Sequence, residues 1–284
     1  MKIWVIAKEG LLGRDLCEFL QKEGISFVGS AHHEVDILDK EMIEDFCEKH
    51  KPTHMINCAA YVNVDEAEGE GKERAYALNV IGPKNLVTLA KKKGIRLIHI
   101  STDYVFDGRK GSAYLETDAV HPINVYGKTK LEGEKEVLQY EKGLSFRTSS
   151  IYGPGKPGMI TGMIEALKTE KEVRHISDQV SSPTYTKDIA AAIVAILDQV
   201  GIFHFTNLGE VSRYGLLVHL WHLLQKKKIS LQCSRVISVT QKEAKRKAIR
   251  PEWSVLSTRK IEPFLKHPIR TWEEALREYV DTLC

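Results

Sequence analysis

The 284-residue sequence contains few cysteines, and their spacing argues against two kinds of small protein. The five cysteines lie far apart, are odd in number and include no Cys-x-x-Cys pair. This pattern argues against a zinc ribbon and a disulfide framework, and it suits a reducing compartment. We therefore expect a cytoplasmic protein that holds no metal.

Long apolar runs, one-sided charge and internal repeats are missing as well. No stretch of about 18 uncharged apolar residues is present, and the first residues lead into a short strand-like run, 3–7, rather than a secretory leader. Lysine and arginine number 41 and acidic residues 38, a net charge of +3. Neither a membrane nor a nucleic acid is therefore expected as a partner, and small-molecule chemistry is favoured.

The sequence does contain a globular composition and a regular alternation of strand-like and helix-like segments. Hydrophobic residues make up 43% and charged residues 28%. Strands are expected at residues 3–7, 26–29, 55–59, 97–101 and 144–150, with helices between them at about 12–20, 42–46, 73–93 and 126–138. Apolar strands joined by helices predict an α/β fold with a Rossmann-like, doubly wound parallel sheet, because the crossovers bury both faces.

A loop rich in glycine and proline at 151–157 marks a change of organisation. Further helices are expected at 160–168, 186–200, 214–227 and 271–283, with strands at 173–176 and 202–207. We assign residues 1–150 and about 178–208 to a nucleotide-binding Rossmann part. The remainder, about 151–177 and 209–284, is assigned to a smaller C-terminal α/β substrate-binding part.

The first glycine-rich loop has the spacing of a dinucleotide-binding turn. Ala7, Gly10 and Gly13 occupy the three glycine positions of a G-x-x-G-x-x-G pattern, with alanine in place of the first glycine. The loop follows the first strand and opens a helix, where backbone N–H groups and the helix dipole hold a pyrophosphate. We favour a dinucleotide site over a merely structural turn.

A Tyr-x-x-x-Lys pair, Tyr126 and Lys130, begins the helix expected over 126–138. Residues four apart share a helix face, so the ammonium can lower the phenol pKa and make the tyrosine a usable proton donor. By spacing alone, a surface pair is the commoner explanation. The stretch Ser101 to Gly108, at the end of an expected strand, adds hydroxyl groups where ligands of open α/β sheets bind. The three motifs in this order predict an active site.

These motifs resemble the dTDP-4-dehydrorhamnose reductase family of the extended short-chain dehydrogenase/reductase superfamily. The resemblance extends over nearly the whole chain. The stretches that share the family pattern are Asn57 to Tyr61, Val64 to Glu68, Ser101 to Gly108, Pro122 to Glu134, Arg147 to Ser149 and Asp178 to Thr184.

The resemblance implies a reductase of a 4-keto nucleotide sugar that uses NADPH or NADH. Tyr126 would protonate the oxygen at C4 of the sugar, Lys130 would bind the nicotinamide ribose and lower the tyrosine pKa, and Thr102 would hydrogen-bond the reacting oxygen. Asp103 and Ser150 would lie on the sugar side. The implied dinucleotide-binding positions are Gly10, Leu11, Leu12, Gly13, Asp36, Ile37, Ala59, Ala60, Tyr61, Tyr126 and Lys130. A homodimer is among the assemblies open to such a protein.

Several positions that would contact the substrate or determine the choice of dinucleotide differ from the family pattern. Ser150 replaces a tryptophan, and Met159 stands in place of an aromatic residue. No acid stands directly after the second expected strand, where Gly29 to His33 follow, so the carboxylate that selects NAD is expected to be absent. Together with Lys8 in the glycine loop, this slightly favours NADPH.

These departures keep other functions open. A dinucleotide-binding member that regulates a partner enzyme, and a reductase or epimerase of a related nucleotide sugar, both agree with the sequence. His99, inside an apolar strand, is interpreted as a packed core residue because no spaced set of metal ligands accompanies it. The run 242–250 holds five positive charges and suits a diphosphate site and a solvated loop equally.

Overall fold

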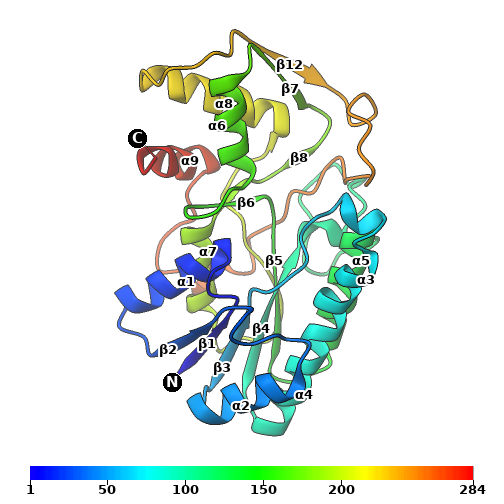
Figure 1. Ribbon diagram of the computed structural model, residues 1–284, viewed down its shortest axis with the longest axis vertical. Coiled ribbons are helices and arrows are strands. Elements are labelled where there is room, and N and C mark those ends of the chain that lie inside the picture. Colours follow the sequence, from blue (N-terminus) through cyan, green and yellow to red (C-terminus); the bar gives the residue numbers. More distant parts are fainter. Residues whose placement is uncertain (284) are drawn as a thin grey trace.

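A parallel sheet between two layers of helices forms the lower part of the molecule, and a second group of helices and strands lies beyond one end of the sheet (Figure 1). The computed structural model describes residues 1–283. The six strands of the sheet are β1 Ile3–Ile6, β2 Phe27–Ser30, β3 His54–Asn57, β4 Arg96–Thr102, β5 Gly143–Thr148 and β10 Gly201–His204. Their order is β10-β5-β4-β3-β1-β2, with every neighbouring pair parallel.

Both faces of this sheet are buried under helices. Side chains alternate along β1, so Ile3 and Val5 face one core and Trp4 and Ile6 the other. The first core is completed by α1 (Leu11–Lys22) and α7 (Thr186–Ala195). The second is completed by α2 (Lys40–His50), α4 (Gly82–Lys93) and α5 (Val125–Leu138). The predicted Rossmann-like, doubly wound parallel sheet is confirmed.

The long helix expected over 73–93 is divided by a π-helical turn. α3 (Lys72–Tyr76) continues through that turn, Ala77–Ile81, into α4, which has a proline in its first turn. α5 packs closely here, because a Cβ on Gly133 would stand 1.9 Å from the Asn79 carbonyl oxygen. The turn therefore occurs where two helices are in close backbone contact.

The second group of elements has its own core of apolar side chains, which includes Leu167, Val173, Leu220 and Leu276. Its elements are α6 (Met159–Thr169), β7 (Glu172–Ile176), α8 (Arg213–Lys226), β12 (Arg235–Val239) and α9 (Trp272–Asp281), with the short strands β6 (Ile151–Tyr152), β8 (Val180–Ser181), β9 (Thr184–Tyr185) and β11 (Val211–Ser212). The 3-10 turns span Glu66–Glu68, Asp103–Val105 and Glu262–Phe264. The division of the chain at residues 150, 178 and 208 stays a prediction. Over residues 1–283, no helix has the length and apolar character needed to cross a membrane.

Candidate active site

The carboxyl ends of β1, β3 and β4 lie side by side and bring the predicted motifs together. β1 pairs with β3, and β3 with β4, in parallel register. The glycine loop follows Ile6, Asn57 ends β3, and Thr102 ends β4. The strand order reverses at β1, because β2 lies on its other side. In open α/β sheets, nucleotides bind in the crevice at this kind of reversal.

The loop between β1 and α1 has the shape that a pyrophosphate site requires. Ala7 has a φ of +64°, a left-handed conformation that strains a residue with a Cβ. A Cβ on Gly13 would stand 2.2 Å from the Ala7 carbonyl oxygen, so glycine is needed for α1 to approach the loop. No side chain caps the amino end of α1, so its first N–H groups, those of Leu11 and Leu12 among them, have no intrahelical partner and can bind an anion. The loop therefore fits a dinucleotide.

Gly13→Ala is expected to weaken dinucleotide binding by about tenfold or more and to lower the free energy of unfolding by about 1–3 kcal/mol, because the added methyl meets the Ala7 carbonyl. Fluorescence titration with NADPH and urea denaturation measure the two effects. Gly162→Ala in α6 is the matched control, because nothing lies within 4 Å of its added methyl. An unchanged dissociation constant in Gly13→Ala would exclude this loop as the dinucleotide site.

The remaining predicted dinucleotide positions fall into two groups. Asp36 borders a shallow pocket at the start of α2, and Ala59 and Ala60 are half-buried after β3. The side chains of Ile37 and Tyr61 are buried in the core, and the Tyr61 N–H is bonded within the protein. Core packing uses both side chains, and the placement of Ile37 and Tyr61 at the cofactor stays a prediction.

The Glu34 carboxylate lies at the end of β2, although no acidic residue directly follows this strand in the sequence. The chain turns so that the Glu34 N–H donates to the Ala31 carbonyl at 3.0 Å. The Glu34 carboxylate accepts from the Ala31 N–H at 2.7 Å and from Lys8 Nζ at 2.9 Å. The Lys8 hydrogen bond lowers the pKa of Glu34. The expected absence of an acid here is wrong, because a residue four positions beyond the strand folds back.

Tyr126 and Thr102 meet where α5 begins beside the end of β4. Asn124 caps α5, with its side-chain oxygen accepting from the Gly127 N–H at 2.7 Å. A Cβ on Gly127 would lie 2.2 Å from the Tyr104 carbonyl oxygen, so glycine allows this close approach. Burial raises the pKa of Tyr126 above its ordinary value, which keeps the phenol protonated. The Thr102 hydroxyl favours the phenolate form of Tyr126 and so lowers the phenol pKa in part.

Lys130 lies one turn further along α5 and is directed into the sheet. Its side chain is 2% exposed, and Nζ donates to the Ile100 carbonyl at 2.6 Å and lies 3.2 Å from His99 Nε2. Burial lowers the pKa of Lys130 to about 8. Burial raises the Tyr126 pKa here and Lys130 is engaged by β4, so the expected lowering of the tyrosine pKa by Lys130 stays a prediction.

Asp103, predicted to face the sugar, is instead buried behind Thr102. Its carboxylate accepts from the hydroxyls of Thr102 at 3.0 Å, Ser149 at 2.7 Å and Ser254 at 2.5 Å. Burial raises the pKa of Asp103, and the three hydroxyls oppose this shift. With its oxygens engaged by protein hydroxyls, Asp103 holds Thr102 in place, and the expected position of Asp103 on the sugar side stays a prediction.

Ser150 follows β5 in a strained conformation, with a φ of +49°. Its hydroxyl lies 2.7 Å from that of Ser181 in β8. A small polar pair thus occupies the place at which the family pattern has a tryptophan. The role of Ser150 in substrate binding stays a prediction.

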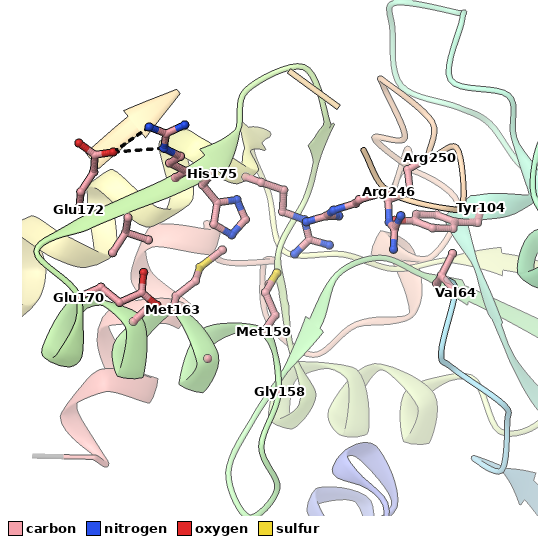
Figure 2. A pocket seen from close by; sticks show the side chains of 15 residues that line it. Val64, Tyr104, Gly158, Met159, Met163, Glu170, Glu172, His175, Arg246 and Arg250 are labelled. Atoms are coloured by element: carbon pink, nitrogen blue, oxygen red, sulfur yellow. Dashed lines mark hydrogen bonds and ion pairs between the residues drawn. The ribbon is translucent and has the colours of Figure 1, made fainter. Parts of the chain in front are cut away.

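A pocket of about 670 Å³ opens beside Tyr104, whose ring packs edge-on against Tyr126 with the ring centroids 5.8 Å apart. Four arginines line it, Arg174, Arg213, Arg246 and Arg250, and Figure 2 shows Arg246 and Arg250 next to Tyr104. The apolar lining from α6 and β7 includes Met159, Met163 and Val173. The pocket therefore joins a cationic region near the tyrosines to an apolar wall.

Asp65 fixes the cationic side of this pocket to the Rossmann part. Its carboxylate accepts from the two terminal nitrogens of Arg250, at 2.6 and 3.0 Å, and from the Ala248 N–H at 3.0 Å. The Arg250 hydrogen bond lowers the pKa of Asp65 to about 2. Since Arg246 and Arg250 line the pocket, the structure favours the binding alternative for the basic run 242–250. Arg213 has no motif around it that predicts this position.

The doubly wound sheet, the glycine loop and a Tyr–Lys pair beside a strand-end threonine define an extended short-chain dehydrogenase/reductase, an oxidoreductase class. The particular family follows from the whole chain. Residues 1–284 match the family model described as the RmlD substrate binding domain. The chain belongs to this family, as the motifs predicted.

Named relatives agree with this membership. The chain is 34% identical to the dTDP-4-dehydrorhamnose reductase of Streptomyces griseus, over 99% of this chain and 94% of that one. It is also 34% identical to the dTDP-4-keto-6-deoxy-D-glucose reductase of Streptomyces niveus, over 97% and 95%. A dTDP-4-dehydrorhamnose reductase from Bacillus anthracis, solved in complex with NADP, has a TM-score of 0.92 and 28% identity over 99% of both chains.

Proposed function

We propose that this protein reduces the 4-keto group of a nucleotide sugar with NADPH or NADH, and that its substrate is dTDP-4-dehydrorhamnose, giving dTDP-L-rhamnose. The observation that supports this most strongly is that Thr102 lies at the carboxyl end of β4 and Tyr126 at the start of α5, with Tyr126 packed against Tyr104 of the arginine-lined pocket. The named relatives act on substrates of this kind. We place the reaction in the cytoplasm, which the cysteine content suits.

The proton in this reaction comes from Tyr126. A bound nicotinamide dinucleotide supplies a hydride to the C4 carbon of the sugar. The half-buried Tyr126 keeps its phenol protonated and gives that proton to the C4 oxygen, so the ketone becomes an alcohol. When substrate binds, the Thr102 hydroxyl exchanges its Asp103 acceptor for that oxygen and donates to it as charge develops. Tyr126 is left as a phenolate and regains its proton from solvent.

The pocket beside Tyr104 fits the rest of such a substrate. Guanidinium groups bind phosphate oxygens through paired hydrogen bonds, so Arg213 and Arg246 suit the diphosphate, while Arg250 is held by Asp65 and adds its positive charge. The apolar wall contributed by α6 suits the flat face of a base, with Met159 supplying contact area where the family has an aromatic residue.

The choice between NADPH and NADH is set by the Lys8–Glu34 pair in this proposal. A carboxylate at the end of β2 accepts from a ribose 2′-hydroxyl and repels a 2′-phosphate, whereas a lysine attracts the phosphate. Glu34→Gln is therefore expected to strengthen NADPH binding relative to NADH by about tenfold, because the carboxylate charge is removed and Lys8 is released. Fluorescence titration with both dinucleotides measures the ratio.

Glu18→Gln, an exposed change of equal charge on α1, is the control for the Glu34 variant. It is expected to leave the NADPH-to-NADH ratio at the wild-type value. The same ratio in Glu34→Gln would show that the pair does not take part in the choice.

The substrate is tested by supplying dTDP-4-dehydrorhamnose, formed in place by a 3,5-epimerase, and following dinucleotide oxidation at 340 nm. NMR of the product identifies the sugar. Turnover to dTDP-L-rhamnose is expected. Dinucleotide binding without turnover on any keto sugar would support the regulatory alternative instead.

The second candidate function is reduction of a related substrate. The Streptomyces niveus reductase is as similar to this chain as the Streptomyces griseus protein is. In addition, Ser150 and Ser181 occupy the position of a family tryptophan. Omitting the epimerase supplies dTDP-4-keto-6-deoxy-D-glucose. Faster turnover on that ketone would move the assignment to it.

A further inference from the structure

Asn124, two residues before Tyr126, forms hydrogen bonds with both ends of its side-chain amide, and it is 2% exposed. Its Oδ1 accepts from the Gly127 N–H at 2.7 Å, and its Nδ2 donates to the Ile249 carbonyl at 2.8 Å. These two partners fix the amide orientation, because a reversed amide would place donor against donor and acceptor against acceptor. Capping α5 requires only the oxygen. The Nδ2 contact is therefore a separate link from α5 to a residue 125 positions away.

Ile249 belongs to the segment 240–250, the arginine segment, which carries two of the pocket arginines. Figure 1 shows this part of the chain passing from β12 to the helices α3 and α5. Gln241 joins the two ends of the segment, because its Nε2 donates to the Arg250 carbonyl at 3.2 Å and its Oε1 accepts from the Arg250 N–H at 3.3 Å. Arg246 lies within the loop closed in this way. A ligand that binds Arg246 therefore restrains Ile249 as well.

The 3-10 turn Glu66–Glu68 makes a second link between α5 and the arginine segment. Glu68 Oε1 accepts from the Val125 N–H at 2.7 Å. Asp65, directly before the turn, accepts from the Ala248 N–H at 3.0 Å. The start of α5 is thus connected to the arginine segment twice, once directly and once through this turn.

We propose that Asn124 is a positioning residue that couples the diphosphate site to Tyr126 by linking the arginine segment to the start of α5. This inference rests on the proposed reductase function. When Arg246 donates to the diphosphate of a nucleotide sugar, the arginine segment is held in place. Through Nδ2 of Asn124, the backbone that carries Tyr126 is held as well. Binding energy from a part of the substrate that does not react is thereby used to orient the proton donor.

Two substitutions separate this link from the helix cap. Serine is as good an N-cap as asparagine but has no second group that can donate to Ile249, so Asn124→Ser keeps the cap and removes the link. Asn124→Asp also keeps the cap, and it places an oxygen opposite the Ile249 carbonyl. Thr271→Ser, which preserves the cap of α9, is the matched control.

The first test is amide hydrogen exchange of the full-length protein with and without saturating dTDP. In the wild type, dTDP is expected to slow exchange in the arginine segment and in the first turn of α5 by about tenfold or more. In Asn124→Ser, the arginine segment is expected to be slowed as in the wild type, and the first turn of α5 by at most about threefold. Equal slowing of that turn in the wild type and both variants would overturn the proposal, as would no effect of dTDP on the wild type.

The second test is steady-state reduction of dTDP-4-dehydrorhamnose by NADPH, with kcat expressed per NADPH site so that unfolded protein is not counted. Asn124→Ser is expected to lower kcat about tenfold and to leave KM and the NADPH dissociation constant within about twofold, because only the orientation of Tyr126 changes. Thr271→Ser is expected to keep all three values. Wild-type kcat in both Asn124 variants would overturn the coupling and leave the reductase function in place. Exchange slowed by dTDP at α5, in a wild type that does not turn over, would support the coupling and contradict the reductase function.

Discussion

Tyr126→Phe is expected to lower kcat by about 10²- to 10⁴-fold and to leave dinucleotide affinity within about twofold. The substitution removes the hydroxyl that we propose gives its proton to the C4 oxygen, and it keeps the ring that packs against Tyr104. Thr102 and the glycine loop are untouched. Steady-state oxidation of NADPH gives kcat, and fluorescence titration gives the dissociation constant.

A matched control removes a tyrosine hydroxyl elsewhere. Tyr152 is buried in the second core, away from β4 and the start of α5, and Tyr152→Phe is expected to keep the wild-type kcat. Wild-type turnover in Tyr126→Phe would show that another group supplies the proton.

Arg147→Met is expected to lower the free energy of unfolding by about 3–5 kcal/mol. Arg147 and Glu134 have side-chain exposures of 2% and 1% and form a two-point ion pair between β5 and α5, with Nε 2.9 Å from the carboxylate. Removing the guanidinium leaves the Glu134 charge buried and without its main partner. Urea denaturation followed by circular dichroism measures the loss.

The double variant Glu134→Leu, Arg147→Met separates this charge effect from lost packing. It is expected to recover most of the stability, because no buried charge is left without a partner. If Arg147→Met alone costs less than about 1 kcal/mol, the pair is not an important source of stability.

The sheet and the order of its motifs could be predicted because residues that are neighbours in the sequence determine each strand and helix. Apolar runs such as 3–6 and 97–101 are too short for helices and are separated by amphipathic segments, so their parallel arrangement follows from the crossovers. Thr102 ends one such strand, and the glycine loop follows another. Their meeting at the carboxyl ends of the strands therefore follows from the parallel arrangement. The capping box that Thr271 and Glu274 form at the start of α9 is equally local, because its two residues are three positions apart.

Other features could not be predicted, because they depend on contacts between segments that are far apart in the sequence. Glu34 reaches the end of β2 through a loop, and Arg213 reaches the pocket at the start of α8, where no motif marks it. β12 was not expected, because its half-exposed residues pair with β7 about 60 positions away. His99 is buried, as predicted, but its contact with Lys130 depends on the packing of α5 against β4.

The central claim is that hydride reaches the C4 carbon of the sugar while Tyr126 supplies the proton. The most direct measurement is deuterium transfer from NADPH labelled at the reactive position of the nicotinamide, with the product examined by NMR and mass spectrometry. We expect the wild-type protein to form a product sugar with one deuterium at C4. We expect Tyr126→Phe to form almost no product in the same time. A bound dinucleotide that keeps its deuterium while the keto sugar is unchanged would contradict the account.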